Sequence, residues 1–298
     1  MSVLITGANG FLGYYLTDLL LQKGHQVIAT GRGECRLPFH GRQDFQYIPM
    51  DFTEPAAILS VFERCKPETV VHAGAMSKPD DCELNQELAF NINVQGTANV
   101  LQASEKHQSF FILVSSDFVF DGERGMYREH DKPNPVSYYG STKLQAELAV
   151  QQYIFDWSII RTVLVYGRPI TGRSNLLSIV KEKLEKGEEY CVVDDQLRTP
   201  TYVEDLATGI AAVIEIKAKG IFHVSGEEVL TPYQMAIRTA EYLKLDSSLI
   251  KRVTAADFSQ PAKRPPRTGF VIDKAKKQFG FHPVSFEIGL EKTFNGQK

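Results

Sequence analysis

The stretch Val3-Leu4-Ile5-Thr6-Gly7-Ala8-Asn9-Gly10-Phe11-Leu12-Gly13 decides how the chain folds. It is a short apolar strand that runs into a turn with glycines at 7, 10 and 13. Leucines at helical spacing follow as far as Gly24, and residues 26–30 are a second apolar run. Glycines allow a tight turn close to a ligand, and the N-terminus of the following helix attracts a pyrophosphate. This order predicts a dinucleotide-binding unit.

The end of the second strand indicates which dinucleotide is bound. An acidic residue there binds the ribose hydroxyls of NAD, whereas an arginine receives the 2′-phosphate of NADP. Here the strand ends Thr30-Gly31-Arg32, with no acid at its tip, so the sequence favours NADP(H) over NAD(H). Glu34 follows shortly after and keeps NAD open, while Arg32 could also be an exposed loop residue.

Three more apolar runs predict strands at 45–49, 68–72 and 110–114. The run at 68–72 is fully apolar at its centre, as is typical of a parallel strand buried on both faces. We therefore predict an α/β fold with a doubly wound parallel sheet of the Rossmann type. In such a sheet, ligands bind at the carboxyl ends of the strands.

After Gly167 the composition loosens, which predicts a smaller C-terminal α/β lobe that supplies the substrate pocket. We expect a dinucleotide-binding domain at 1–167 and a substrate-binding lobe at 168–298. The segment 198–225 is expected to pack back onto the first domain, because residues 202–216 have a helical pattern and 220–225 a strand pattern.

Several residues that follow the predicted strands allow more than one interpretation. Asp51 either accepts a hydrogen bond from an adenine amino group or caps a helix at 55–64. His72 is interpreted as packed core, and the small residues 73–75 suit a close approach of the cofactor. One long helix is expected from about 83 to 105; Asn91 and Asn93 interrupt its apolar face, where a buried amide needs a partner.

Tyr139 and Lys143 lie four residues apart in Pro135-Val136-Ser137-Tyr138-Tyr139-Gly140-Ser141-Thr142-Lys143, so on a helix they share one face. A tyrosine hydroxyl with a pKa near ~10 is a poor base, but a neighbouring ammonium favours the phenolate and lowers that pKa. The pair can therefore move a proton at neutral pH. An amphipathic surface helix would explain the same spacing. Ser115 and Ser116, after the strand at 110–114, either donate to a substrate oxygen or cap the next turn.

Together these stretches resemble the short-chain dehydrogenase/reductase superfamily in its extended branch. The closer resemblance is to the dTDP-4-dehydrorhamnose reductases and their sugar-nucleotide-binding relatives. It covers nearly the whole chain in the family's order, through residues 6–13, 93–97, 115–122, 139–143, 161–167, 195–201 and 264–266. It implies NADP(H)-dependent reduction of a nucleotide-linked 4-keto-6-deoxy sugar, in which the cofactor supplies the hydride.

The resemblance also implies roles for individual residues. Ser116 would hold the substrate carbonyl, Tyr139 would donate the proton, and Lys143 would bind the nicotinamide ribose and keep the tyrosine acidic. Cofactor contacts are expected at Gly7, Asn9, Gly10, Phe11, Leu12, Gly13, Arg32, Asp51, Phe52, Ala73, Gly74, Ala75, Asn93, Tyr139 and Lys143. Substrate contacts are expected at Ser77, Asp117, Phe118, Arg198 and Arg267. Arg267 lies in a basic, proline-rich segment, 260–267, which either binds phosphate or is a solvated loop.

Two positions depart from the family pattern. Family reductases usually carry Asp-Tyr after the triad hydroxyl, whereas this chain has Asp117-Phe118. The related 4,6-dehydratases need Asp-Glu there, so Phe118 argues against that activity. Arg198 stands where many of these reductases have a small residue, and epimerase-like relatives use an arginine there on the nucleotide diphosphate. This leaves the nucleotide of the substrate open.

Composition excludes several other classes of protein. The net charge is -3, with 43% hydrophobic and 23% charged residues, which is typical of a globular protein and not of a nucleic-acid binder. No apolar run approaches the ~20 residues of a membrane span, and no export signal is visible, so we expect a cytoplasmic protein. Four scattered cysteines predict reduced thiols, and the scattered histidines predict no metal site. The expected partner is a small nucleotide sugar; a homodimer is compatible with the resemblance.

Two other functions stay open. One is an epimerase of the same superfamily that retains NAD and returns the hydride, a reading that Arg198 supports. The other is a non-catalytic NADP-binding subunit on the same fold, like the regulatory subunit of methionine adenosyltransferase. Such a subunit need not keep the triad, and all three triad residues are present here.

Overall fold

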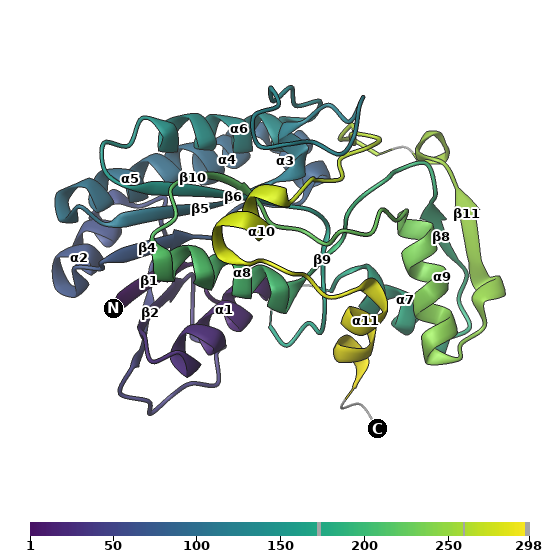
Figure 1. Ribbon diagram of the computed structural model, residues 1–298, viewed down its shortest axis with the longest axis horizontal. Helices are drawn as coiled ribbons and strands as arrows, with labels where there is room; N and C mark the ends of the chain where they lie inside the picture. Colours follow the sequence, from purple (N-terminus) through teal and green to yellow (C-terminus); the bar gives the residue numbers. More distant parts are fainter. Residues whose placement is uncertain (172–173, 259, 296–298) are drawn as a thin grey trace.

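A parallel sheet forms the centre of the computed structural model, which describes residues 1–171, 174–258 and 260–295 (Figure 1). In this part of the chain, seven strands pair in the order β10-β6-β5-β4-β1-β2-β3, and every pairing is parallel. They are β1 (Ser2–Thr6), β2 (Gln26–Gly31), β3 (Phe45–Pro49), β4 (Thr69–His72), β5 (Phe110–Ser116), β6 (Trp157–Thr162) and β10 (Gly220–His223). The predicted α/β class with a doubly wound parallel sheet is confirmed.

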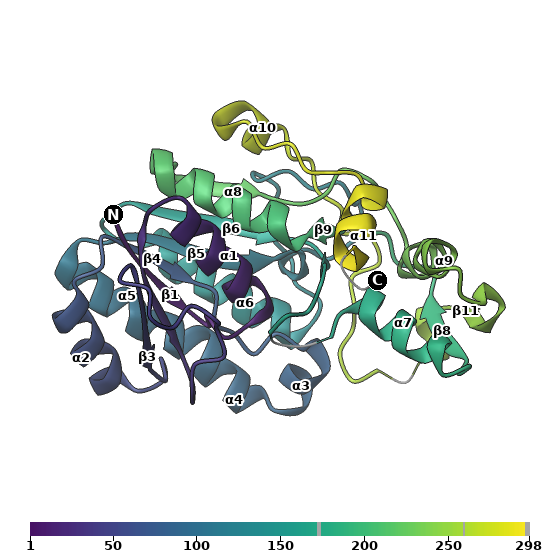
Figure 2. The same cartoon turned by 90° about the horizontal axis from the view of Figure 1, so that it is seen from below.

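Helices cover both faces of this sheet, as Figure 2 shows from below. One face carries α1 (Phe11–Gln22) and α8 (Val203–Ile216); the other carries α2 (Pro55–Cys65), α5 (Gly96–His107) and α6 (Tyr138–Gln151). Alternate side chains of β1 enter the two cores, Val3 and Ile5 on one side and Leu4 on the other. Because both faces are buried, the central strands are continuous apolar runs instead of alternating ones.

The helix expected from about 83 to 105 is confirmed over most of its length. α4 (Gln86–Phe90), a π-helical turn at Asn91–Gln95 and α5 follow one another without a break, and Asn85 separates them from the short α3 (Pro79–Leu84). Asn93 lies in the π turn and is buried. Its amide donates to the Met76 carbonyl and to the Thr142 hydroxyl, both at 3.0 Å, and its oxygen accepts from the Met76 N–H at 2.8 Å. The buried Asn93 amide therefore has the hydrogen-bond partners that a buried amide requires.

Beyond Gly167 the chain forms a smaller group of elements and then returns to the sheet. In that group α7 (Leu176–Glu185) and α9 (Pro232–Leu243) pack on the parallel pair β8 (Tyr190–Val193) and β11 (Ile250–Val253). Between them, α8 packs against α1, and β10 becomes the edge strand beside β6. Both lie within the segment 198–225. The division into domains at residue 167 stays a prediction.

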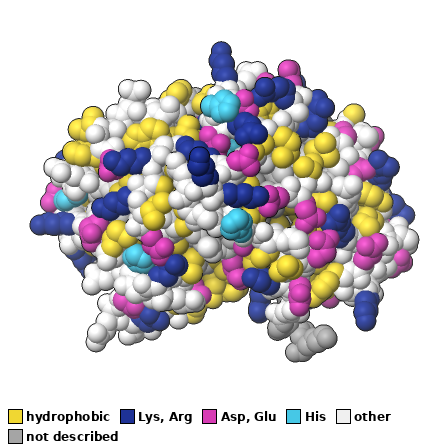
Figure 3. All heavy atoms as spheres, in the orientation of Figure 1, with side chains coloured by type: hydrophobic (Ala, Val, Ile, Leu, Met, Phe, Trp, Pro, Cys, Tyr) yellow, Lys and Arg dark blue, Asp and Glu magenta, His cyan; other side chains and the backbone are white. Residues whose placement is uncertain are grey.

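Short elements join these parts. They are β7 (Val165–Tyr166) paired with β9 (Thr201–Tyr202), α10 (Asp273–Phe279), α11 (Phe286–Phe294), and 3-10 turns at Asp117–Val119, Ser247–Leu249 and Ala255–Asp257. None of the helices in the described ranges combines the length and apolar character that a membrane crossing requires. On the face drawn in Figure 3, basic and acidic side chains are interspersed, so no broad area of one sign covers that face.

Candidate functional site

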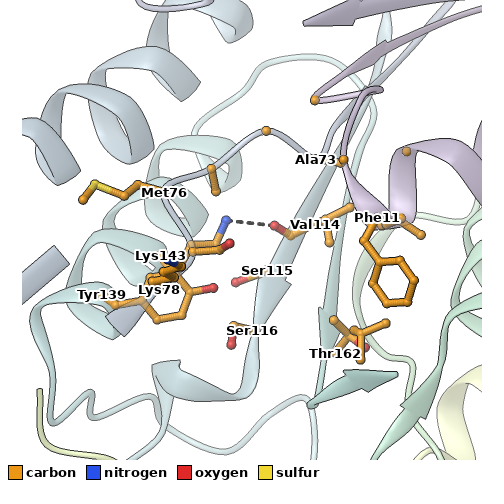
Figure 4. Close-up of a pocket in the computed structure, with 18 of the residues that line it drawn as sticks. Phe11, Ala73, Met76, Lys78, Val114, Ser115, Ser116, Tyr139, Lys143 and Thr162 are labelled. Carbon is orange, nitrogen blue, oxygen red and sulfur yellow. Dashed lines mark hydrogen bonds between the residues drawn. The ribbon is translucent and has the colours of Figure 1, made fainter. Parts of the chain in front are cut away.

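A cavity of about 1110 Å³ opens at the carboxyl ends of the sheet strands, where the strand order reverses between β1 and β4 (Figure 4). Such a switch point is where open α/β sheets bind their ligands. Most residues expected in the site line this main cavity: Gly7, Asn9, Gly10, Phe11, Leu12, Gly13, Arg32, Asp51, Phe52, Ala73, Gly74, Ala75, Ser77, Ser116, Asp117, Phe118, Tyr139, Lys143 and Arg198. Asn93 and Arg267 are not among its lining residues.

The glycine turn forms one wall of the cavity, and its geometry requires glycine. Gly7 has a φ of +69°, and a Cβ on it would lie 2.8 Å from the Gly74 Cα. A Cβ on Gly13 would lie 2.4 Å from the Ala8 carbonyl oxygen. Gly10 begins α1 without a side-chain cap, so the first N–H groups of the helix have no side-chain acceptor there. This wall offers a tight turn and a helix N-terminus to an anionic ligand.

Asn9 holds the loop that follows β2. Its amide donates to the Glu34 carbonyl at 2.9 Å and to the Tyr47 hydroxyl at 2.8 Å, and its oxygen accepts from the Arg36 N–H at 3.0 Å. Arg32 and Arg36 are both exposed, and both line the cavity. Sequence reasoning missed Arg36, although a second arginine four residues after Arg32 in the same loop was an available signal. Two guanidinium groups thus lie at this end of the cavity.

Asp51 and Phe52 line the cavity after β3. The Asp51 carboxylate accepts from the N–H and the hydroxyl of Thr53, at 2.9 and 2.8 Å, while Glu54 is the N-cap of α2. The interpretation of Asp51 as a helix cap is therefore wrong, and a contact with adenine remains a prediction. The Phe52 ring packs so closely that a Cβ on Gly74 would lie 2.4 Å from its Cε1.

Ser116, Tyr139 and Lys143 converge on the same space from two elements. Ser116 ends β5, and Tyr139 and Lys143 share one face of α6, which the Ser137 hydroxyl caps. Figure 4 shows the phenol, the ammonium and the two serine hydroxyls at 115 and 116 in one part of the cavity. Lys143 is buried and donates to the Val114 carbonyl at 2.8 Å. Burial lowers the pKa of Lys143 to about 8.

Asp117 is buried beside Ser116, which donates to its carboxylate at 3.0 Å. The Thr268 hydroxyl donates to the other carboxylate oxygen, and the Arg198 Nε lies 3.8 Å from it. Burial raises the pKa of the Asp117 carboxyl, and the nearby guanidinium acts against that rise. The neighbouring Phe118 ring packs edge-on against the Tyr139 ring, with centroids 5.5 Å apart. Phe118 therefore keeps an aromatic contact with the expected proton donor.

Arg198 lines the cavity, but its guanidinium already donates hydrogen bonds to other groups of the protein. Nη1 donates to the carbonyls of Leu197 and Pro266, at 2.8 and 3.2 Å. Nη2 donates to the Gln196 side chain at 3.0 Å and to the Pro265 carbonyl at 2.7 Å. Only 4% of the residue is exposed. The guanidinium therefore joins two segments of chain, which leaves few donors for a ligand.

Two expected contacts lie elsewhere. Asn93 is buried behind the cavity wall, where its amide bonds to the backbone of Met76. It therefore holds a lining residue in place and does not itself face the cavity. Arg267 is exposed and donates to the Glu123 carbonyl. Arg264, three residues earlier, lines the cavity instead. It belongs to the family-like run 264–266, so the signal for it was present, but the segment alone does not tell which arginine points inward.

His72 belongs to the core, as interpreted from the sequence. It is 1% exposed, and its Nδ1 and Nε2 lie 2.7 and 3.1 Å from the hydroxyls of Thr6 and Thr97. Burial lowers its pKa to about 3, so it is neutral at physiological pH. Among the described residues, no three or more His, Cys, Asp or Glu side chains are grouped so that they could hold a metal ion.

Comparisons with known proteins agree with this geometry. The family model described as RmlD substrate binding domain matches residues 1–298. The chain is 32% identical to methionine adenosyltransferase 2 subunit beta of Xenopus laevis, over 97% of this chain and 86% of that one. It is 28% identical to a dTDP-4-dehydrorhamnose reductase of Aggregatibacter actinomycetemcomitans, over 97% of both chains. A crystal structure of dTDP-4-dehydrorhamnose reductase from Bacillus anthracis in complex with NADP superposes with a TM-score of 0.86, at 28% identity and over 98% of each chain.

Proposed function

Because the chain belongs to the RmlD substrate binding domain family, among the extended short-chain dehydrogenases/reductases, we propose that it reduces a nucleotide-linked 4-keto-6-deoxy sugar with NADPH. The chain is an NAD(P)-dependent oxidoreductase of that type; the sugar, the nucleotide and the preference for NADPH are the proposal. One observation carries it: Ser116, Tyr139 and Lys143 meet in the same cavity as the glycine turn.

The cavity wall fits a dinucleotide. A side chain at Gly7 or Gly74 would collide with the residues that line the cavity there. The uncapped start of α1 offers N–H donors to a pyrophosphate. Arg32 and Arg36 supply positive charge for a 2′-phosphate, which supports NADPH over NADH. The nicotinamide cofactor supplies a hydride to the substrate carbonyl carbon when it is bound.

The residues of this chain then have the task of orienting the carbonyl and moving a proton. The Ser116 hydroxyl binds the carbonyl oxygen, and the Tyr139 hydroxyl donates a proton to that oxygen as negative charge develops on it. The buried Lys143 ammonium stabilises the phenolate left behind, because an adjacent cation lowers the pKa of a phenol. The Val114 carbonyl fixes that ammonium at 2.8 Å.

A second candidate is a non-catalytic NADP-binding subunit, which the 32% identity to methionine adenosyltransferase 2 subunit beta favours. The complete triad in the cavity supports the reductase over this alternative. The epimerase has little support in the structure, because Arg198, its main argument, already donates to Gln196 and to three backbone carbonyls.

The test is NADPH consumption with a dTDP-4-keto-6-deoxy sugar, measured for the wild type and for Tyr139→Phe. We expect turnover in the wild type and a loss of at least about 100-fold in kcat in the variant, because general-acid catalysis typically contributes that much. Tyr138→Phe is the matched control: this neighbour lies outside the cavity lining and should retain turnover. NADPH binding without turnover in the wild type would contradict the reductase and favour the binding subunit. Equal turnover in Tyr139→Phe would remove Tyr139 from the mechanism.

A further inference from the structure

The segment 262–268 crosses from the small lobe to α3 and lies along the main cavity. On one side it is bound to the chain after β8: Leu197 donates to the Pro266 carbonyl at 2.8 Å, and Thr268 donates to the Leu197 carbonyl at 3.1 Å. On the other side the Ala262 N–H donates to the Asp80 carboxylate at 3.1 Å. Figure 1 shows the chain between β11 and α10 reaching across to α3. The segment therefore links two parts of the molecule beside the cavity.

Arg264 and Asp80 form an ion pair at this crossing. The two terminal nitrogens of Arg264 bind the two carboxylate oxygens of Asp80, at 3.0 and 2.6 Å. Arg264 lines the cavity, and so do Pro79 and Asp81, which flank Asp80 in α3. The Arg264 side chain is 18% exposed and that of Asp80 is 34% exposed, so water reaches the pair. A carboxylate of the protein thus holds a guanidinium that faces the ligand cavity.

The two arginines on this side of the cavity differ in how readily they can change partners. Arg198 is buried, and its terminal nitrogens donate to three carbonyls and to Gln196, so freeing it would leave buried acceptors unpaired. Arg264 is partly exposed, and ion pairs in contact with water contribute little to stability. Its planar fork also matches the two oxygens of a phosphate as well as those of a carboxylate. Arg264 is the guanidinium that can exchange its partner for a ligand.

We propose that Asp80 competes with the diphosphate of the nucleotide-sugar substrate for Arg264. This inference rests on the substrate class proposed above. With no ligand bound, the terminal nitrogens of Arg264 donate to the Asp80 carboxylate. When the nucleotide binds, they donate to its diphosphate instead. Asp80 therefore weakens nucleotide binding and speeds the release of a nucleotide-linked product. The segment stays attached meanwhile, because Arg198 holds Pro265 and Pro266 independently of Arg264.

The test measures the Kd of dTDP by calorimetry at constant ionic strength for the wild type, Asp80→Asn, Asp81→Asn and Asp80→Asn/Arg264→Gln. The amide at position 80 keeps an acceptor for the Ala262 N–H but loses the charge that competes for Arg264. We expect Asp80→Asn to bind dTDP up to about fivefold more tightly, because an ion pair in contact with water is worth at most about 1 kcal/mol. Asp81→Asn is the matched control, since Asp81 is the adjacent acid, also lines the cavity and pairs with Lys78 instead. It should change the Kd by less than about twofold. The double variant should lose the gain.

Two results would overturn the competition. Equal tightening in Asp80→Asn and Asp81→Asn would reveal a general charge effect, and an unchanged or weaker affinity in Asp80→Asn would mean that Asp80 does not compete for Arg264. If the wild type binds dTDP in that second case, the proposed substrate class survives. If neither the wild type nor Asp80→Asn binds dTDP while both bind NADPH, a dTDP-linked substrate is excluded and the competition fails with it.

Discussion

Glu147 and Arg161 form an ion pair that is almost completely buried, with side chains 0% and 2% exposed. Arg161 binds both carboxylate oxygens through Nε and Nη2, and the Ser115 hydroxyl donates to one of them at 2.6 Å. Glu147 lies one turn after Lys143 on α6, while Ser115 and Arg161 are neighbours on β5 and β6. This pair therefore joins the helix that carries Tyr139 and Lys143 to the strands that carry Ser116.

Glu147→Gln should destabilise the protein strongly, because it leaves the Arg161 charge buried without a counter-ion. Removal of one partner of a buried pair typically costs about 3–5 kcal/mol in the free energy of unfolding. Urea unfolding monitored by circular dichroism measures this loss. Glu182→Gln is the control, since Glu182 pairs with Lys186 on the surface and its loss should have no measurable effect. A change in Glu147→Gln as small as in this control would mean that Arg161 has another compensating partner.

At the scale of whole elements, one side chain connects the π turn at Asn91–Gln95 to two other parts of the chain. Asn93 makes three hydrogen bonds, two to the backbone of Met76 and one to the Thr142 hydroxyl on α6. Met76 follows β4 and lines the cavity. The amide thus ties the cavity wall to the helix that carries the proposed proton donor. π turns inside helices are frequent at functional sites.

Asn93→Ala should lower the free energy of unfolding by about 1–3 kcal/mol, because it leaves the Met76 N–H and carbonyl without these partners. Urea unfolding at neutral pH provides the value. Asn91→Ala makes the same chemical change two residues earlier, at an exposed position, and should be close to neutral. If both variants lost the same stability, the hydrogen bonds of Asn93 would not explain the effect, since alanine has the higher helix propensity at both positions.

Local patterns predicted the strands and most of the helix at 86–107, but not the π turn within it. The runs at 45–49 and 110–114 lie in β3 and β5, because an apolar run between turn residues depends on nearby sequence alone. The π turn at 91–95 includes Asn93, whose side chain bonds to distant residues, and such contacts leave no trace in the periodicity. The same limit applies to the site: the sequence located the basic segment 260–267, but only the tertiary packing shows Arg264 at the cavity and Arg267 outside it.

At the scale of the whole molecule, Arg198 connects three distant parts of the chain. Its side chain binds residues 265 and 266 in the segment beside the cavity, its own segment after β8, and Asp117 at the end of β5. The Thr268 hydroxyl, two residues after Pro266, donates a hydrogen bond to the same Asp117 carboxylate. The buried arginine thus connects the end of β5 to the C-terminal part of the chain.

Arg198→Met should destabilise the protein by about 3–5 kcal/mol at neutral pH, as expected for breaking a buried charge pair. The loss should depend on pH in a specific direction. Burial already raises the pKa of Asp117 above its ordinary value of 3.8, and removal of the guanidinium, which opposes that rise, raises it further. Above 3.8 the folded variant therefore keeps a proton that the unfolded chain has released, so its free energy of unfolding falls as the pH rises toward the raised pKa.

The deficit relative to the wild type should consequently be smallest near pH 4 and grow toward neutrality, which urea titrations between about pH 4.5 and 7.5 would measure. Arg198→Met/Asp117→Asn is the decisive comparison, because it removes the carboxyl that titrates and should abolish the pH-dependent part. Lost packing and lost hydrogen bonds to the carbonyls of Pro265 and Pro266 do not titrate, so they set the constant part of the deficit. A deficit of equal size at every pH would mean that Arg198 stabilises the molecule through those carbonyls alone, and that hydrogen bonds from Ser116 and Thr268 suffice for the Asp117 carboxylate.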